Sequence, residues 1–257
     1  MTATPPSPNI ARLARERSAV VAAVMPALDE EASVGRVVAS LPSWLHEVVV
    51  ADNGSTDRTA EVAAAAGARV VPAPRRGYGE ACQRALAALD PAVTHVVFLD
   101  ADASDDPDDL PALLAPLLRD EADLVIGSRA RGEVEPGALL PQQRFGNWLA
   151  TRLIRLGFGH RYTDLGPFRA VTREGLARLA MADRTWGWTV EMQVRALQEG
   201  LRVVEVPVRY RRRVGRSKIA GTVRGTVAAG WCILTTIARL RRRGGPATPQ
   251  RPLRDQS

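Results

Sequence analysis

Short apolar segments alternate with helical patterns through the first half of this chain, and this alternation constrains the fold more than any other feature. Apolar stretches predict strands at residues 19–25, 47–51, 68–71, 95–99 and 123–127. Helical patterns lie between them, at residues 32–41, 56–66, 79–89 and 107–118. Strands that alternate with helices form a mostly parallel sheet covered on both faces, so we expect an α/β fold. Ligands of such sheets bind outside the carboxyl ends of the strands.

The fourth predicted strand ends in two carboxylates, Asp100 and Asp102. Side chains two positions apart in an extended chain point the same way, so these two acids should repel each other. A divalent cation such as Mg²⁺ or Mn²⁺ would relieve that repulsion, because hard cations take carboxylate oxygens and keep a substrate phosphate in the same shell. A solvated acidic loop is the alternative interpretation.

The acids that follow this pair have a separate explanation. The segment Asp106-Pro107-Asp108-Asp109 is typical of a helix start, with an N-cap, a proline at the first position and acids near the positive end of the helix dipole. We therefore expect these later acids to be structural.

The remaining chain is organised differently. We expect residues 1–18 to be disordered, residues 19–218 to form the α/β domain, residues 219–243 to hold an amphipathic helix and residues 244–257 to be disordered. Helices are predicted at residues 142–156, 173–180, 189–200 and 223–240, and a strand at residues 201–210. The apolar segments are shorter than the roughly 18–20 residues that cross a bilayer.

The composition limits the partners. The 257-residue chain has a net charge of +7, which favours nucleic acid, anionic lipid or a phosphorylated substrate. Aromatic residues make up only 5% and do not interleave with the basic runs, so nucleic acid is the weakest of these options. Two cysteines are too few for a disulfide framework and suit a reducing cytosol.

Several short motifs follow the predicted strands in a characteristic order. They are VMPALDEE at residues 24–31, ADNGSTD at 51–57, RGYG at 76–79 and LDAD at 99–102, then GSR at 127–129, TDLGPFR at 163–169 and RRVGRSK at 212–218. This order resembles glycosyltransferase family 2, whose members have the GT-A fold, a Rossmann-like α/β sheet. The later motifs resemble its branch of polyprenyl- and dolichyl-phosphate hexose synthases.

The resemblance implies a role for each matching residue. The nucleoside pocket would be lined by Pro26, Ala27, Asp29, Glu30 and Asp52, although a plain Asx turn would also explain Asp52. Gly77 and Gly79 would let the backbone approach the donor, unless they only form a flexible turn. A metal on the donor diphosphate would be held by Asp100 and Asp102, with Ala101 between them and Ser104 nearby.

Cationic side chains would stabilise the charge that develops on the diphosphate leaving group. The candidates for donor or acceptor phosphates are Arg129, Arg144, Arg212, Ser217 and Lys218. A solvated basic face is the alternative for the arginines. The family usually has a serine four residues after the acceptor-site arginine, whereas Trp148 follows Arg144 here.

The acceptor decides whether a general base is needed. A phosphate monoester is largely ionised near neutral pH, with a second pKa of about 6, and attacks without one. A sugar hydroxyl requires a base, for which Asp164 and Glu191 are the candidates. Both could equally hold structure together.

The last predicted helix bears on whether the protein binds a membrane surface. Val223, Val227, Trp231, Leu234, Ile237 and Leu240 recur at spacings of three or four residues. Such a face suits either an interfacial helix on anionic lipid or packing in the core. Trp148, Leu149, Leu153 and Leu156 could form a second interfacial surface.

These expectations combine into a leading hypothesis and two alternatives. In the first, an inverting, metal-dependent enzyme moves a hexose from a nucleotide sugar (GDP-mannose or UDP-glucose) to a polyprenyl phosphate. It would work in the cytoplasm, peripherally bound to the inner face of the cell membrane. In the second, the acceptor is a soluble or glycan hydroxyl. In the third, the chain is a basic binding module without catalytic activity.

Overall fold

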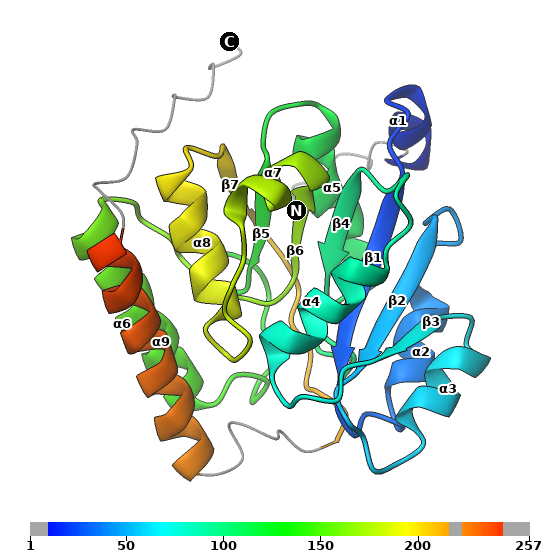
Figure 1. Cartoon of the computed structure of the whole chain (residues 1–257), viewed down its shortest axis with the longest axis horizontal. Helices are drawn as coiled ribbons and strands as arrows, with labels where there is room; N and C mark the ends of the chain where they lie inside the picture. Colours follow the sequence, from blue (N-terminus) through cyan, green and yellow to red (C-terminus); the bar gives the residue numbers. More distant parts are fainter. Residues whose placement is uncertain (1–9, 216–222, 244–257) are drawn as a thin grey trace.

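A mostly parallel sheet of seven strands forms the centre of the molecule (Figure 1). The computed structural model describes residues 10–215 and 223–243. The strands are β1 (Val21–Ala27), β2 (Glu47–Asp52), β3 (Arg69–Pro72), β4 (His95–Phe98), β5 (Leu124–Ser128), β6 (Arg169–Thr172) and β7 (Val203–Pro207), in the spatial order β3-β2-β1-β4-β6-β5-β7. Only β6 runs antiparallel to its neighbours β4 and β5. The expected α/β fold is therefore confirmed.

Helices cover both faces of this sheet. They are α1 (Ile10–Glu16), α2 (Val34–Ser40), α3 (Thr59–Ala65), α4 (Tyr78–Ala88), α5 (Leu110–Leu118), α6 (Pro141–Phe158), α7 (Arg173–Leu179), α8 (Trp188–Gln198) and α9 (Val223–Arg243), with the short 3₁₀ helix η1 (Pro107–Asp109) before α5. Alternate residues of a strand face opposite cores. Val24 packs with α4 and α8, whereas Met25 packs with α2 and α5.

The C-terminal helix packs against the body of the molecule through its last turns. Ile237 and Leu240 are buried in the core, and Ile233 packs against it. Figure 1 shows α9 beside α6, with α8 next to the pair. The core-packing alternative thus holds for this end of the helix. Trp231, which we had expected on the same face as Ile237 and Leu240, is exposed. No described helix is both long and apolar enough to cross a bilayer.

Two expectations about local structure were wrong. Residues 10–16 form α1 instead of belonging to a disordered segment, because Ile10 and Ala14 are buried where this helix packs on α5. Strand β6 was not predicted at all. It is four residues long and begins with Arg169, whose side chain is buried and donates to the backbone carbonyls of Thr189, Leu165 and Gly166.

Candidate active site

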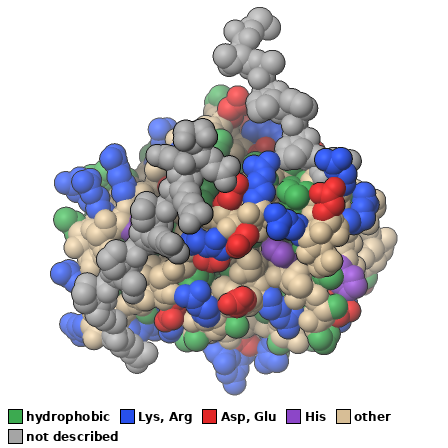
Figure 2. Space-filling view, turned by 90° about the horizontal axis from the view of Figure 1, so that it is seen from above, with side chains coloured by type: hydrophobic (Ala, Val, Ile, Leu, Met, Phe, Trp, Pro, Cys, Tyr) green, Lys and Arg blue, Asp and Glu red, His purple; other side chains and the backbone are tan. Residues whose placement is uncertain are grey.

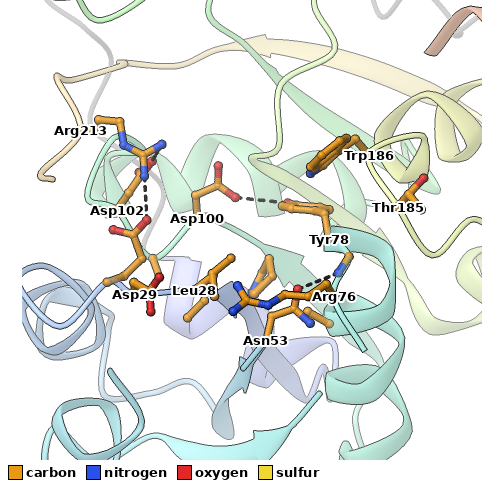
Figure 3. A pocket seen from close by; sticks show the side chains of 16 residues that line it. Leu28, Asp29, Asn53, Arg76, Tyr78, Asp100, Asp102, Thr185, Trp186 and Arg213 are labelled. Carbon is orange, nitrogen blue, oxygen red and sulfur yellow. Dashed lines mark hydrogen bonds and ion pairs between the residues drawn. The ribbon is translucent and has the colours of Figure 1, made fainter. Parts of the chain in front are cut away.

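A pocket of about 510 Å³ opens at the carboxyl ends of β1, β2 and β4 (Figure 3). Strand β1 and the loop after it contribute Pro26, Ala27, Leu28, Asp29 and Glu30. The other lining residues are Asn53, Arg76, Gly77, Tyr78, Ala81, Asp100, Ala101, Asp102, Thr185, Trp186 and Arg213. The sequence motifs that follow separate strands therefore meet at one edge of the sheet, as the fold class predicts.

Hydrogen bonds between loops fix the part of the pocket nearest β1 and β2. The Asp29 carboxylate accepts from the amide of Thr56 at 2.7 Å, and the Asp29 amide donates to the Ser55 hydroxyl at 2.9 Å. Asp52 accepts from the amide of Ser55 at 3.0 Å and does not line the pocket, so the Asx-turn interpretation fits it better.

Asn53 does line the pocket and holds the neighbouring loop in place. Its amide nitrogen donates to the carbonyls of Ala73 and Arg75, and its oxygen accepts from the amide of Gly77 at 2.8 Å. A neutral amide can make all of these contacts, because it both donates and accepts. Asn53 thus shapes the pocket without a charge of its own.

Positions 77 and 79 must be glycine because a neighbouring loop packs closely against them. A side chain at Gly77 would overlap the carbonyl oxygen of Arg184, and one at Gly79 would overlap that of Asp183. The amide of Gly79 donates to the carbonyl of Thr185 at 3.1 Å. The close approach that we expected at these glycines is therefore made to residues 183–185 of this chain. Gly77 also lines the pocket.

Residues 183–187, which we call the wall loop, carry Thr185 and Trp186 into the pocket beside Tyr78 (Figure 3). Asp183 anchors the wall loop from within. Its buried carboxylate accepts from the amide and hydroxyl of Thr185 at 2.7 and 2.8 Å, and from Thr236 and Arg239 of α9 at 3.3 and 3.2 Å. Helix α9 is thus bonded directly to one wall of the pocket.

Acidic side chains gather at the floor of the pocket. Asp100 accepts from the Tyr78 hydroxyl at 3.2 Å, and the amide of Asp100 donates to Asp105 at 3.0 Å. Loss of surrounding water, together with the nearby charge of Asp102, raises the pKa of Asp100 to about 7. Burial, together with Asp100, also raises the pKa of Asp105. This cluster accumulates negative charge that a cation would relieve.

The chemistry of this cluster fits a divalent cation bound together with a phosphorylated ligand. Asp100 and Asp102 both line the pocket, and the Oδ1 atom of Asp105 is buried without a hydrogen-bond partner. The described residues hold no cluster of three or more acidic, His or Cys side chains arranged for a metal. Carboxylates from Asp100 and Asp102 would therefore be completed by ligand phosphate and water, as is usual for Mg²⁺.

Ser104 lies behind this pair and does not line the pocket. It is fully buried, its amide donates to the Asp102 carboxylate at 2.9 Å, and its carbonyl accepts from the amide of Arg211. Ser104 orients Asp102 in this structure. The later acids form the predicted helix start: Asp106 accepts from the amide of Asp108, and Asp109 pairs with Arg209 at 2.9 Å.

The cation beside Asp102 in the pocket is Arg213 and not Arg212, and Arg76 lines another part of the pocket. Arg213 lies 2.7 Å from Glu30 and 3.2 Å from Asp102. Arg212 is exposed, bonds to the carbonyl of Pro136 and takes no part in lining the pocket. Neighbouring side chains of an extended segment point in opposite directions, so Arg212 and Arg213 cannot both face the pocket. The sequence analysis selected Arg212, which the structure places outside the pocket, because the chain after β7 is no longer a regular strand.

Arg129 and Asp164 neutralise each other. The Arg129 guanidinium makes two bonds of 2.8 and 2.7 Å to the Asp164 carboxylate, which also accepts from the Arg129 amide. Both side chains are shielded from water, and neither lines the pocket. The charge of Asp164 raises the pKa of Arg129 above its ordinary value, against the opposing effect of burial. A paired, buried carboxylate of this kind is poorly placed to take a proton from an acceptor.

Glu191 also has a structural role. It is buried, accepts from the amides of Ala182 and Asp183 at 3.0 and 2.6 Å, and pairs with Arg195 at 2.9 Å. These contacts hold the start of the wall loop, and Glu191 does not line the pocket. Arg144 is exposed on α6, away from the lining residues. Ser217 and Lys218 lie outside the described residues.

Sequence reasoning missed several pocket residues, among them Arg76, Tyr78, Trp186 and Arg213. Tyr78 lies inside the RGYG motif, so its neighbours could have pointed to it. Trp186 lies more than a hundred residues from Tyr78 in the sequence, and only the tertiary fold brings the two together. No local pattern distinguishes it.

The fold and pocket define a class of enzyme: a GT-A glycosyltransferase, whose sheet presents acidic loops to a nucleotide sugar. The chain belongs to glycosyltransferase family 2, because residues 22–179 match the model described as "Glycosyl transferase family 2". The expected enzyme class and GT-A fold are thus confirmed.

Three known proteins illustrate the similarity. An uncharacterized glycosyltransferase of Mycobacterium tuberculosis is 41% identical over 214 residues, which cover 81% of this chain and 94% of that protein. The dolichyl-phosphate hexose transferase of Haloferax volcanii is 35% identical over 203 residues, covering 77% of this chain and 86% of its own. Glucosyl-3-phosphoglycerate synthase of Mycobacterium tuberculosis, crystallised with Mn²⁺, UDP-glucose and phosphoglyceric acid, superposes with a TM-score of 0.75 at 26% identity, covering 94% of this chain and 86% of that one.

Proposed function

We propose that this glycosyltransferase moves a hexose from a nucleotide sugar, GDP-mannose or UDP-glucose, to a polyprenyl phosphate. The observation that carries the proposal is the commitment of both candidate bases, Asp164 and Glu191, to ion pairs outside the pocket. An acceptor that is already an ionised phosphate needs neither of them. The similarity to a dolichyl-phosphate hexose transferase supports this acceptor class.

In the proposed reaction, an acceptor phosphate oxygen bonds to the anomeric carbon of the hexose as the bond to the donor diphosphate breaks. We assign the nucleoside to the side of the pocket formed by Asp29, Glu30 and Asn53, and the diphosphate to the side near Asp102 and Arg213. A bound Mg²⁺ or Mn²⁺ would neutralise charge on the leaving diphosphate. Asp100 and Asp102 would hold that ion, and Arg213 would add a second positive charge.

Tyr78 and Trp186 would form the wall next to the hexose. Their rings offer flat apolar surface, and the Tyr78 hydroxyl bonds to Asp100, which fixes its orientation toward the metal-binding acids. Trp186 closes the same side and excludes water from the sugar. The competing hydrolysis of the donor would then be suppressed.

A phosphorylated hydroxyl acceptor is the second candidate. It is favoured by the similarity to glucosyl-3-phosphoglycerate synthase, a structure that contains UDP-glucose and phosphoglyceric acid. A polyprenyl phosphate acceptor would place the enzyme at the inner, cytoplasmic face of the cell membrane. A phosphoglycerate acceptor would require no membrane contact.

The deciding experiment offers both acceptors to one preparation of enzyme. A panel of nucleotide sugars is incubated with Mn²⁺ or Mg²⁺ and either a short-chain polyprenyl phosphate or 3-phosphoglycerate, and products are identified by mass spectrometry. We expect a hexosyl polyprenyl phosphate to form from one donor, and none when Asp102→Asn replaces the wild type. Transfer only to phosphoglycerate would reject the lipid acceptor, and full activity of Asp102→Asn would reject the assigned diphosphate site.

A further inference from the structure

Helix α6 presents an apolar side to solvent. Phe145, Trp148 and Leu156 are 62%, 54% and 69% exposed, although residues of this size normally bury most of their surface. Their spacing places them on one side of the helix, whereas Ala150, Ile154 and Phe158 face the core from the other side. The rings of Phe145 and Trp148 contact each other, with centroids 5.8 Å apart.

Helix α9 continues this surface. Trp231 is 70% exposed, on the side opposite the buried Ile237 and Leu240. The two helices pack side by side, and their last turns meet where a side chain added at Gly157 would lie 3.7 Å from Arg241. We call the exposed side chains of the two helices the α6–α9 face; they are Arg144, Phe145, Trp148, Arg152, Arg155, Leu156, Trp231, Arg241 and Arg242.

The charge of this face is entirely of one sign. Neither α6 nor α9 contains an Asp or Glu, whereas α6 has three arginines and α9 has five. In the centre of the face shown in Figure 2, by contrast, acidic and basic side chains are intermixed. Arg152 lies over the Trp148 ring at 6.0 Å, so guanidinium groups and aromatic rings are interleaved here.

We infer that the α6–α9 face docks on a lipid bilayer that carries anionic headgroups. Aromatic rings gain free energy at the boundary between headgroups and acyl chains, and arginines are attracted to anionic lipid. A second copy of this chain fits the face less well, because two such faces would oppose arginine to arginine without an acid between them. The inference extends the proposed function. The link to a lipid acceptor rests on that function, whereas the binding of the face to lipid does not depend on it.

The position of this face relative to the pocket suits a lipid acceptor. Asp183 anchors the wall loop and accepts from Thr236 and Arg239 of α9. The helix that would lie on the bilayer is therefore bonded to the segment that carries Trp186 into the pocket.

Sedimentation with lipid vesicles tests the inference in the absence of donor and acceptor. The full chain is mixed with phosphatidylcholine vesicles that contain or lack phosphatidylglycerol, and the bound fraction is measured over a range of salt concentrations. We expect binding only to the anionic vesicles, about tenfold weaker when the salt is raised severalfold. Failure of the wild type to bind anionic vesicles would overturn the inference.

Two double variants separate the apolar from the electrostatic contribution. Trp148→Ser with Trp231→Ser, and Arg152→Glu with Arg241→Glu, should each weaken vesicle binding at least about tenfold. The matched control is Arg36→Glu with Arg119→Glu, which makes the same change in net charge at two exposed arginines outside α6 and α9 and should bind as the wild type does. An equal loss in this control would show that vesicle binding depends only on net charge and would overturn the assignment of the face.

Two further measurements complete the test. Unchanged melting temperatures would exclude unfolding of the variants, and we expect that outcome because all of the substituted residues are exposed. A concentration-dependent dimer that the tryptophan variant abolishes would identify a second copy as the partner instead. Transfer to a short-chain, water-soluble polyprenyl phosphate should persist in both variants, so failure of vesicle binding and failure of the proposed reaction are distinguished.

Discussion

The guanidinium of Arg213 lies 3.2 Å from the carboxylate of Asp102. The same guanidinium lies 2.7 Å from Glu30, so one cation joins the loop after β1 to the acids after β4. Charge-assisted contacts of this kind hold a side chain in a fixed position. Arg213 thus faces the place where the proposed donor diphosphate would lie.

Replacing Arg213 by alanine should weaken donor binding. Loss of one charge-assisted hydrogen bond costs about 1.5–3 kcal/mol, which corresponds to at least a tenfold rise in the dissociation constant of the nucleoside diphosphate. Isothermal titration calorimetry with Mn²⁺ present measures this directly. Arg212→Ala is the matched control, because its side chain lies outside the pocket, and should change the constant less than about threefold. Equal losses in the two variants would contradict the assignment.

Asp100→Asn should stabilise the protein without ligands, increasingly so at higher pH. The pKa of Asp100 is raised to about 7 in the folded protein, whereas it is about 4 in the unfolded chain. The contribution of Asp100 to the stability of the folded protein is therefore fully present below about pH 4 and is lost as the pH rises through about 7. Asparagine stays neutral throughout. Urea unfolding without divalent ions should show no difference at about pH 4 and a gain of about 1–2 kcal/mol at about pH 8.

The same variant should lose its advantage when ligands are supplied. Binding of Mn²⁺ and a nucleoside diphosphate stabilises only the protein that can hold them. Wild-type protein should therefore gain more stability from these ligands than Asp100→Asn does. A gain of equal size in both proteins would show that Asp100 takes no part in binding them.

Glu191→Gln should affect stability more than turnover. The carboxylate accepts from two amides and pairs with Arg195 beneath the wall loop, so a neutral amide weakens those contacts and costs about 1–3 kcal/mol in unfolding free energy. The turnover number of the folded fraction should fall less than about fivefold. A drop of a hundredfold or more at unchanged stability would instead identify Glu191 as a base.

Gly79→Ala should destabilise the chain by at least about 2 kcal/mol, because the new methyl group would overlap the backbone carbonyl of Asp183, which has little freedom to move. Chemical denaturation measures the change. Gly146→Ala is the matched control: Gly146 lies within α6 with no atom near the added methyl, so its replacement should stabilise the helix by about 0.5–1 kcal/mol. Similar losses at the two positions would contradict the close packing of the wall loop.

The extent to which sequence alone predicted this site depends on the range of the interactions involved. The helix start at Asp106 was predictable, because its N-cap bond spans two residues. The gathering of the loops after β1, β2 and β4 followed from the parallel sheet. Asp164 and Glu191 were ambiguous, since the partner of Asp164, Arg129, lies 35 residues away, and Glu191 holds a loop whose course no local pattern reveals.

The choice between Arg212 and Arg213 shows most clearly what could not be predicted from the sequence. Alternation along an extended chain correctly places neighbouring arginines on opposite sides. Which side faces the pocket depends on how the irregular segment after β7 crosses the sheet edge, where the amide of Val214 donates to the carbonyl of Asp102. That crossing is determined by the tertiary structure and cannot be predicted from the local sequence pattern.

The carboxylate of Asp183 has partners on both the wall loop and α9, and this gives the C-terminal helix an architectural role. A chain shortened before α9 would leave Asp183 buried without two of its donors and would uncover the core around Ile237 and Leu240. Truncated forms should therefore lose solubility as well as the shape of the pocket. Engineering that adds a tag or partner domain is best placed beyond Arg243, where these bonds are left intact.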